Sequence, residues 1–174
     1  MAFNKVTLKH VPLPPLVCAC ASLRRAARAV TQAYDAELRK TGVNPMQFTL
    51  LHFLSRFGEM SQGEVGELLA VDTTTLTRTL DPLRKSGWIR VRSGEDRRER
   101  RWSLTPAGER KRAEGAPHWE AAQARLRARI GAGRFQSLLS ELAVVADAVR
   151  DPLETHKVPR ARGRRRPERA GGLK

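Results

Sequence analysis

The fold is decided by residues 61–92, which read SQGEVGELLAVDTTTLTRTLDPLRKSGWIRVR. Ser61 followed three residues later by Glu64 is a capping box, which predicts a short helix that ends near Ala70. Asp72 is a suitable N-cap for a second helix, in which leucines recur at intervals of four and three residues. These leucines are Leu76, Leu80 and Leu83. A short helix, a turn and a second amphipathic helix predict a helix-turn-helix.

A basic hairpin follows this pair of helices. Gly87 closes the second helix, and residues 88–92 and 100–104 read as two strands. Residues 93–99 between them form a charged, turn-rich tip. A basic hairpin directly after a helix-turn-helix is a wing, and the combination is far more specific than either part alone.

Further helices flank this lobe. An apolar stripe over residues 16–40 indicates a first helix, with Gly42 as its stop, and Asn44 starts a second helix that runs to Gly58. The stripe of that second helix is Phe48, Leu51, Leu54 and Phe57. After the wing, Thr105 caps a long helix, and a last helix carries the strongest apolar period in the chain. That period is Phe135, Leu138, Leu139, Leu142, Val145, Ala146 and Val149.

The charge of the chain favours a polyanionic partner. There are 33 Lys and Arg against 18 Asp and Glu, a formal charge of +15. Such a field attracts nucleic acid first and acidic membrane second. Residues 157–174 alone hold eight of the basic residues and one acid. With so few apolar side chains, this segment cannot offset its ordering entropy, so it is predicted to be disordered.

Several other classes of protein are disfavoured. No apolar run approaches the ~20 residues of a membrane span. Prolines interrupt the N-terminal apolar segment, which argues against an export signal and for a cytoplasmic protein. There is no nucleophile elbow, phosphate-cradling glycine loop or paired-carboxylate motif, so we expect no enzyme. The histidines and cysteines lack ligand spacing, so neither a metal nor a cofactor is expected.

The chain resembles the MarR family (multiple-antibiotic-resistance regulators) over residues 16–150. Residues 96–98, Asp-Arg-Arg, look like the family's wing motif Asp-x-Arg. Residues 104–108, Leu-Thr-Pro-Ala-Gly, look like the Leu-Thr-x-x-Gly that opens the next helix. Residues 74–80 look like the family's recognition helix, and residues 85–89 like its exit into the wing.

The resemblance implies a homodimer that binds double-stranded DNA. The expected fold is mainly α with a small β wing, a winged helix-turn-helix with dimerisation helices at both ends. Its segments are an extended N-terminal arm (1–14), a first dimerisation helix (15–44), the DNA-binding lobe (45–104), C-terminal dimerisation helices (105–150) and a basic tail (151–174). We expect a transcription regulator, a repressor, on a pseudo-palindromic operator, released by a small-molecule effector.

The predicted DNA contacts lie on the recognition helix and the wing. Threonine can reach phosphates or base edges, and Arg78 can make a bidentate contact to guanine. The helix residues are Thr73, Thr74, Thr75, Thr77, Arg78, Arg84 and Lys85. In the wing, the resemblance assigns Arg98 to the minor groove and Asp96 to bracing a nearby arginine. The remaining wing residues, which would face phosphates, are Arg97, Arg100 and Arg101. A solvated helix face and a solvated charged turn are the plain alternatives.

Two smaller sites stay open. Tyr34, Phe53 and Trp119 could line the effector pocket that the resemblance implies, although core packing is the main expectation. Cys18 and Cys20 point to different sides of a helix, so they should not pair with each other. Structural packing is expected for them first, and an intersubunit disulfide or reactive thiol second.

Two rival functions fit the same sequence. A nonspecific architectural or RNA-associated protein would bind nucleic acid through its basic tail alone, without operator preference. A cysteine-based redox sensor on the same fold would release DNA on oxidation. Deletion of residues 157–174 tests the first rival, and Cys→Ser variants test the second.

Overall fold

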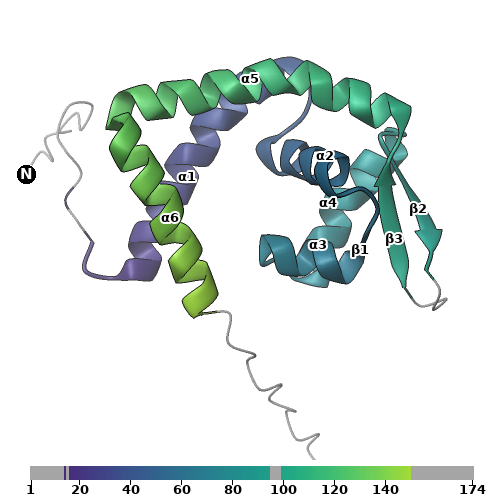
Figure 1. The fold of residues 1–174 in the computed structure, drawn as a ribbon, viewed down its shortest axis with the longest axis horizontal. Coiled ribbons are helices and arrows are strands. Elements are labelled where there is room, and N and C mark those ends of the chain that lie inside the picture. The colour runs from purple at the N-terminus through teal and green to yellow at the C-terminus, as the bar shows by residue number, and fades with distance from the viewer. Residues whose placement is uncertain (1–13, 15, 95–98, 150–174) are drawn as a thin grey trace, which may run out of the picture. The chain divides into compact units, whose positions relative to one another are not determined.

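The computed structural model describes residue 14 and residues 16–94 and 99–149, and Figure 1 shows them as helices with one small sheet. In chain order the elements are α1 (Ala19–Leu38), the 3₁₀ helix η2 (Arg39–Thr41), α2 (Pro45–Phe57), β1 (Met60–Ser61), α3 (Gln62–Leu69), α4 (Thr73–Lys85), β2 (Ile89–Ser93), β3 (Arg100–Leu104), α5 (Pro106–Ile130) and α6 (Ala132–Ala148). The predicted fold class is confirmed. The chain divides into two compact units after Arg129. None of the helices among the described residues has the length and apolar character that a membrane crossing needs.

Capping residues set the start of α2 and the end of α1. The Asn44 side chain accepts a hydrogen bond from the backbone N of Gln47 (2.9 Å), and the Gln47 side chain accepts one from the backbone N of Asn44 (3.0 Å). The N-cap at Asn44 was predicted, and the reciprocal bond with Gln47 makes it a capping box. The first helix begins at Ala19, later than the expected residue 16, and tightens into η2 before Gly42. Gly42 has a φ of 73°, a conformation that glycine adopts without steric cost.

The helix-turn-helix is formed by α3 and α4, and a cap starts each of them. Ser61 Oγ accepts from the backbone N of Glu64 at 3.1 Å, and the Glu64 carboxylate accepts from the backbone N of Ser61 at 2.6 Å. Asp72 accepts from two backbone N–H groups in the first turn of α4, both at 3.0 Å. Between the helices, Ala70 adopts a left-handed conformation with φ 49° and ψ 46°. The turn therefore depends on one strained non-glycine residue.

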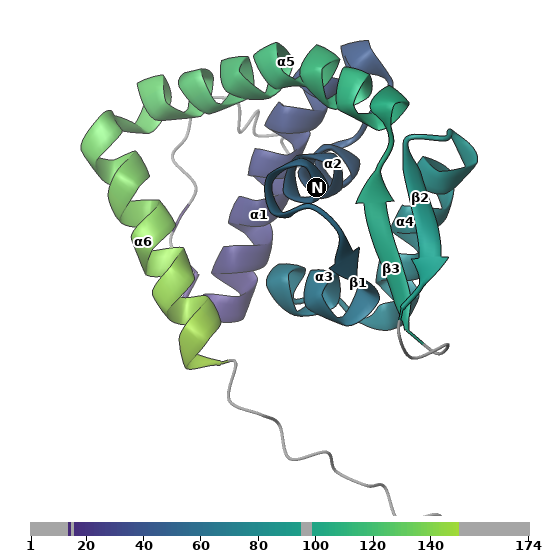
Figure 2. The same cartoon turned by 45° about the vertical axis from the view of Figure 1, so that its right-hand side comes forward.

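The wing contains a third strand that the sequence did not predict. The strand order is β1-β3-β2 and both pairs are antiparallel (Figure 2). Side chains along a strand alternate between the two faces of a sheet. On the face that carries the buried Ile89 and Trp102, the cross-strand partners are Ile89↔Leu104, Val91↔Trp102 and Ser93↔Arg100. On the outer face they are Arg90↔Ser103 and Arg92↔Arg101.

One apolar core joins the end of α1 with α2, α3, α4 and the sheet. Its members are Leu38, Val43, Phe48, Leu50, Leu51, Leu54, Val65, Leu76, Leu80, Leu83, Ile89 and Trp102. The three leucines of α4 are at most 1% exposed, which confirms the predicted inner face of that helix. Phe57, which was predicted to share the α2 stripe, is 54% exposed. It lies at the last position of α2 and meets the edge of Phe53, with ring centroids 5.9 Å apart.

The long helix α5 approaches α2 closely at a glycine. A Cβ at Gly115 would lie 2.7 Å from ring atoms of Phe48, so only glycine allows this approach. About one turn later, Trp119 stacks on Phe48 and on His52, with centroid separations of 6.1 and 5.9 Å. The long helix is thus fixed to α2 by aromatic packing.

The last helix, α6, exposes most of its apolar side chains. Gly131, with φ 86°, is its N-cap residue and separates it from α5. The exposed members are Leu138, Leu139, Leu142, Val144 and Val145, each at least 39% exposed, and Val149 beyond the helix end is 74% exposed. A soluble monomer rarely exposes an apolar patch of this kind, so α6 presents a surface suited to a partner.

Candidate nucleic-acid interface

The side of α4 opposite the core is polar and basic. An α-helix turns by about 100° per residue, so Thr74, Arg78 and Lys85 share the side opposite the buried leucines. All three residues are exposed. A threonine hydroxyl, a guanidinium and an ammonium are suited to phosphate oxygens and base edges. The three side chains are thus free to face a partner, and their contact with DNA stays a prediction.

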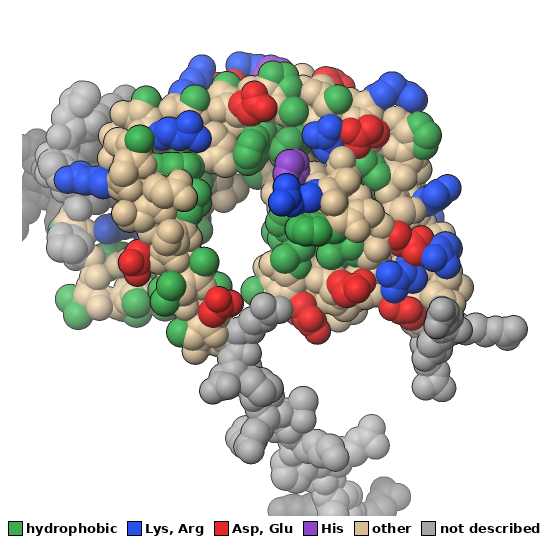
Figure 3. All heavy atoms as spheres, viewed as in Figure 1, with side chains coloured by type: hydrophobic (Ala, Val, Ile, Leu, Met, Phe, Trp, Pro, Cys, Tyr) green, Lys and Arg blue, Asp and Glu red, His purple; other side chains and the backbone are tan. Residues whose placement is uncertain are grey.

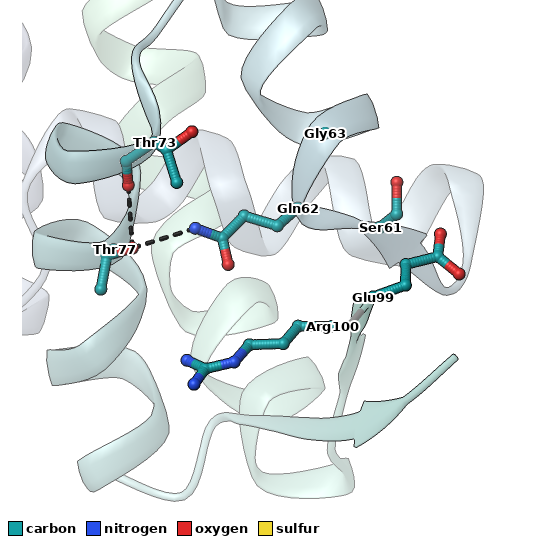
Figure 4. Close-up of a pocket in the computed structure, with 7 residues that line it drawn as sticks. All are labelled: Ser61, Gln62, Gly63, Thr73, Thr77, Glu99 and Arg100. Carbon is teal, nitrogen blue, oxygen red and sulfur yellow. Dashed lines mark hydrogen bonds between the residues drawn. The ribbon is translucent and has the colours of Figure 1, made fainter. Parts of the chain in front are cut away.

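A groove of about 550 Å³ lies between α4 and the wing (Figure 4). Its lining residues are Ser61, Gln62, Gly63, Thr73, Thr77, Glu99 and Arg100. Thr73 and Thr77 come from one flank of α4, one turn apart, and Arg100 comes from the first position of β3. In Figure 4 the Arg100 guanidinium extends across the groove toward α4. A phosphate that entered this groove would meet hydroxyl groups and one cation, that of Arg100, as well as the carboxylate of Glu99.

Thr77 is committed to a bond between the two helices of the helix-turn-helix. Gln62 Nε2 donates to Thr77 Oγ1 at 2.9 Å, and the Thr77 hydroxyl donates to the backbone O of Thr73 at 2.8 Å (Figure 4). The first of these bonds links the start of α3 to α4 across 15 residues of sequence. Thr77 therefore helps to hold the helix-turn-helix, and Gln62 is a groove residue that the sequence analysis missed.

Thr75 belongs to the N-cap of α4. Its hydroxyl donates to Asp72 at 2.6 Å, and its backbone N donates to the same carboxylate at 3.0 Å. The hydrogen bond from the Thr75 side chain is the largest cause that holds the pKa of Asp72 below its ordinary value. The Thr75 hydroxyl is thus directed at the N-cap residue Asp72. The hydroxyl of a residue that reads DNA would instead point outward.

Arg84 lies in the last turn of α4. Its Nε is 3.6 Å from Asp81, and both side chains are 46% exposed, so the ion pair is worth little. Arg84 lines a second groove of about 400 Å³ together with Arg92 and Arg100. Four arginine and lysine residues of the prediction, Arg78, Arg84, Lys85 and Arg100, are thus exposed on α4 and at the groove.

Arg101 lies on the opposite face of the sheet from the one that was predicted. It was expected to face phosphates with Arg100, but the two are consecutive on β3 and so point to opposite faces of the sheet. On the outer face, Arg101 Nε donates to Glu59 at 3.0 Å and Nη1 donates to Glu99 at 3.1 Å. Its side chain is only 26% exposed. Arg101 is thus bound by carboxylates of its own chain, and the period of two along a strand was the signal that the prediction overlooked.

The tip of the wing lies outside the described residues. Asp96, Arg97 and Arg98 belong to it, so their roles in the minor groove stay predictions from the resemblance. The described base of the tip is closed by the backbone N of Gly94, which donates to the backbone O of Glu99 at 2.8 Å. The two sides of the hairpin are therefore hydrogen-bonded to each other as far as Gly94 and Glu99, the residues that flank the tip.

The Leu-Thr-x-x-Gly stretch joins the wing to α5. The backbone N of Thr105 donates to the backbone O of Trp88 at 3.0 Å, and the Thr105 hydroxyl lies 2.6 Å from the backbone O of Gly87. The same hydroxyl oxygen accepts from the backbone N of Gly108 at 3.0 Å. A Cβ at Gly108 would lie 1.9 Å from the Trp88 carbonyl oxygen. Residues 104–108 therefore pack closely against residues 87 and 88, and this contact fixes where α5 begins.

The residues considered for an effector pocket have structural contacts. Trp119 packs against the apolar core and stacks on Phe48. Phe53 meets Phe57 edge-on, as described above. Tyr34 is partly buried, and this burial raises the pKa of its phenol, while Arg127 acts in the opposite direction. Core packing, the main expectation for these side chains, accounts for Trp119 most clearly.

Both cysteines are exposed free thiols. Cys18 is the N-cap residue of α1, and Cys20 lies in the first turn. The packing role that was expected for them is therefore wrong within this chain. Among the described residues, no group of three or more His, Cys, Asp or Glu side chains is placed to hold a metal ion.

A family model matches the part of the chain that holds the helix-turn-helix, and curated relatives match about half of the chain. The model of the MarR family matches residues 41–99. The HTH-type transcriptional regulator YwoH of Bacillus subtilis is 34% identical over 89 residues, which are 51% of this chain and 65% of YwoH. YsmB of the same organism is 33% identical over 90 residues, 51% of this chain and 62% of YsmB. The matched part of the chain thus spans less than two thirds of either relative.

Solved structures extend the likeness to the flanking helices. The transcriptional regulator MosR of M. tuberculosis, solved in complex with DNA, is 36% identical with a TM-score of 0.67, covering 76% of this chain and 98% of that one. MarR of E. coli in its apo form is 19% identical with a TM-score of 0.59, covering 76% and 98%, and shows the shared fold alone. Fold, lobe and relatives together define a winged helix-turn-helix transcriptional regulator. The chain belongs to the MarR family.

Proposed function

We propose that this chain binds duplex DNA as a homodimer and regulates transcription from a pseudo-palindromic operator. The observation that carries the proposal is the outward side of α4, where Thr74, Arg78 and Lys85 lie opposite the buried leucines. The major groove of B-DNA admits one α-helix. Arg78, in the middle of α4, reaches a guanine edge, and its neighbours reach phosphates. MosR, whose structure was solved in complex with DNA, supports this assignment.

The groove beside α4 adds a backbone contact to the proposal. A DNA strand that borders the major groove passes between α4 and the wing, where Arg100 and Thr73 bind a phosphate. Contacts of this kind fix the register of a protein on DNA without reading its sequence. Arg98, on the basis of the family resemblance, enters the adjacent minor groove.

Exposed apolar surface supports the homodimer. The side chains of α6 named above are uncovered within one chain, and Leu23 in α1 is 39% exposed. A second copy of the chain covers these surfaces through the first, fifth and sixth helices, as the resemblance implies. A two-fold dimer then places its recognition helices about one helical turn apart on DNA, which requires a pseudo-palindromic operator.

Repression and release by a small molecule complete the proposal, and both rest on membership of the family. An effector that binds one arrangement of the two lobes more tightly shifts the population away from the arrangement that fits DNA. Tyr34, a residue of the proposed pocket, is only partly buried and carries a phenol that could bind such an effector.

The test compares a duplex that the protein selects from a random pool with a scrambled duplex, across a series of salt concentrations. We expect Arg78→Ala to cost about 1–3 kcal/mol of the preference for the selected duplex. Arg110→Ala is the matched control, because Arg110 is an exposed arginine on α5. If Arg78→Ala and Arg110→Ala lose the same amount of the preference for the selected duplex, the assignment of α4 is refuted. It is also refuted if the wild type shows no such preference.

The same assay separates the two rival functions. A protein that lacks residues 157–174 should keep its preference for the selected duplex, whereas a tail-driven binder would lose its DNA binding altogether. A redox sensor would release DNA on oxidation, and Cys18→Ser or Cys20→Ser would abolish that release. The two exposed thiols are the observation that makes this second rival worth testing.

A further inference from the structure

Two arginines face each other across the wing. Arg92 of β2 and Arg101 of β3 are direct cross-strand partners on the outer face of the sheet. Like charges placed directly opposite in an antiparallel pair destabilise that pair. The wing tolerates them because one carboxylate, that of Glu59, lies against both guanidinium groups. Figure 3 shows acidic and basic side chains side by side over this part of the molecule.

Glu59 binds the two arginines through three hydrogen bonds. Its Oε2 accepts from Arg92 Nε at 2.6 Å, and its Oε1 accepts from Arg92 Nη2 at 2.5 Å and from Arg101 Nε at 3.0 Å. A two-point contact between arginine and a carboxylate fixes orientation as well as distance. The Glu59 side chain is 24% exposed, so water screens the contact only in part. These three residues form what we call the Glu59 cluster.

The Glu59 cluster connects the wing to the helix-turn-helix. Glu59 precedes β1, which leads directly into α3. Arg101 Nη2 also lies 3.8 Å from the Glu64 carboxylate, which in turn accepts from the backbone N of Ser61 at the start of α3. Both strands of the wing are thus tied by arginines to the segment where α3 begins.

We propose that Glu59 is a positioning residue that fixes the wing relative to the helix-turn-helix. The inference rests on the proposed DNA-binding function. Glu59 is not among the residues that line the groove beside α4, and its carboxylate is bound by Arg92 and Arg101 on the outer face of the sheet. It acts through Arg92 and Arg101, and it sets the distance between the contacts of α4 and those of the wing. Operator preference requires both contacts at once, so it depends on that distance.

A simple charge effect predicts the opposite result. Removing a carboxylate from a DNA-binding protein raises its affinity for any duplex, because phosphates are repelled less. Loss of Glu59 also releases two guanidinium groups, which strengthens the same trend. A positioning role instead lowers the ratio of affinities for selected and scrambled duplexes, even where binding to the scrambled duplex becomes tighter. The two explanations therefore differ in the sign of the change in this ratio.

The experiment uses the full chain with Glu59→Gln and measures both affinities by fluorescence anisotropy. Coupling between two binding sites commonly changes affinity by about 5- to 150-fold, and on that scale we expect the ratio to fall by about tenfold. Glu67→Gln is the matched control, because it removes one exposed carboxylate from α3 and leaves the Glu59 cluster intact. The control should leave the ratio unchanged. An unchanged or increased ratio in Glu59→Gln would overturn the proposal.

A second variant keeps the test decisive if Glu59→Gln fails to fold. Arg92→Gln changes a side chain that is 64% exposed and removes the two-point contact. Arg92→Gln should lower the ratio of affinities for selected and scrambled duplexes by a similar factor. In the double variant, Glu59→Gln should lower this ratio little further. Hydrogen exchange should quicken in residues 89–93 and 100–104 but not in α2. Slow exchange with an unchanged ratio overturns this inference alone, whereas a wild type without any preference overturns the proposed function.

Discussion

Replacing Gly108 with alanine tests how the long helix is joined to the DNA-binding lobe. The new Cβ would lie 1.9 Å from the Trp88 carbonyl oxygen and 2.8 Å from a Leu104 methyl carbon. Carbon and oxygen atoms in contact normally lie about 3.3–3.6 Å apart. The Trp88 oxygen cannot retreat freely, because the backbone N of Thr105 donates to it at 3.0 Å. Either α5 or the start of β2 must move by more than an ångström.

The size of the effect follows from three contributions. Overpacking of this kind costs about 1–3 kcal/mol. Displacing the Thr105 joint weakens two hydrogen bonds, each worth about 1 kcal/mol. Alanine returns about 1 kcal/mol through its higher helix propensity. The net loss is on the order of 2–4 kcal/mol, which lowers the melting temperature by roughly 5–15 °C in a chain of this length.

Thermal unfolding followed by circular dichroism measures this change. Gly63→Ala is the matched control, since its new Cβ would lie 3.8 Å from Ser61 Oγ, an ordinary contact. The control should melt with the wild type or slightly above it. If Gly108→Ala also melts at the wild-type temperature, the close packing of Gly108 against Trp88 does not stabilise the fold, and the explanation of the Leu-Thr-x-x-Gly stretch is wrong.

Three further outcomes are expected. Asn44→Ala removes the capping box of α2 and should cost about 1 kcal/mol in denaturant unfolding; an unchanged midpoint would contradict the cap. Ala70→Gly relieves the left-handed residue and should raise stability by up to about 1 kcal/mol, whereas a lower melting temperature would show that Ala70 is unstrained. Hydrogen bonds from Arg92 and from the backbone of Ser61, respectively, hold the pKa values of Glu59 and Glu64 below 4.5. These carboxylates therefore stabilise the fold fully above pH 4.5 and lose that effect only as the pH falls through their lowered pKa values; the contribution of Glu59, measured as the difference between wild type and Glu59→Gln in urea unfolding, should not change between pH 7 and 5.

Local signals in the sequence were sufficient for most of the helices. The N-caps at Asn44 and Asp72, and the capping box at Ser61, identify the residues at which α2, α4 and α3 begin. The leucine period of α4 then identifies its inner face. Each of these features lies within a few residues of the element that it defines, which is why sequence alone reveals it.

Features that depend on distant residues were missed. The two-residue strand β1 exists because it pairs with β3, about forty residues later. The bond between Gln62 and Thr77, and the contacts of Glu59 with Arg92 and Arg101, likewise join separate elements. The error for Arg101 is of another kind, because the alternation of side chains along a strand already separated it from Arg100. The exposure of Cys18 and Cys20 could not be judged without knowing what covers the start of α1.

The central claim is that Arg78 reads a guanine in the major groove. The most direct measurement replaces each guanine of the selected duplex in turn with 7-deazaguanine, which lacks the N7 acceptor that arginine binds. At one position in each half-site, this replacement should weaken wild-type binding about fivefold or more but leave Arg78→Ala unaffected. If every replacement weakens the wild type and Arg78→Ala equally, Arg78 does not contact guanine and the assignment of α4 is wrong.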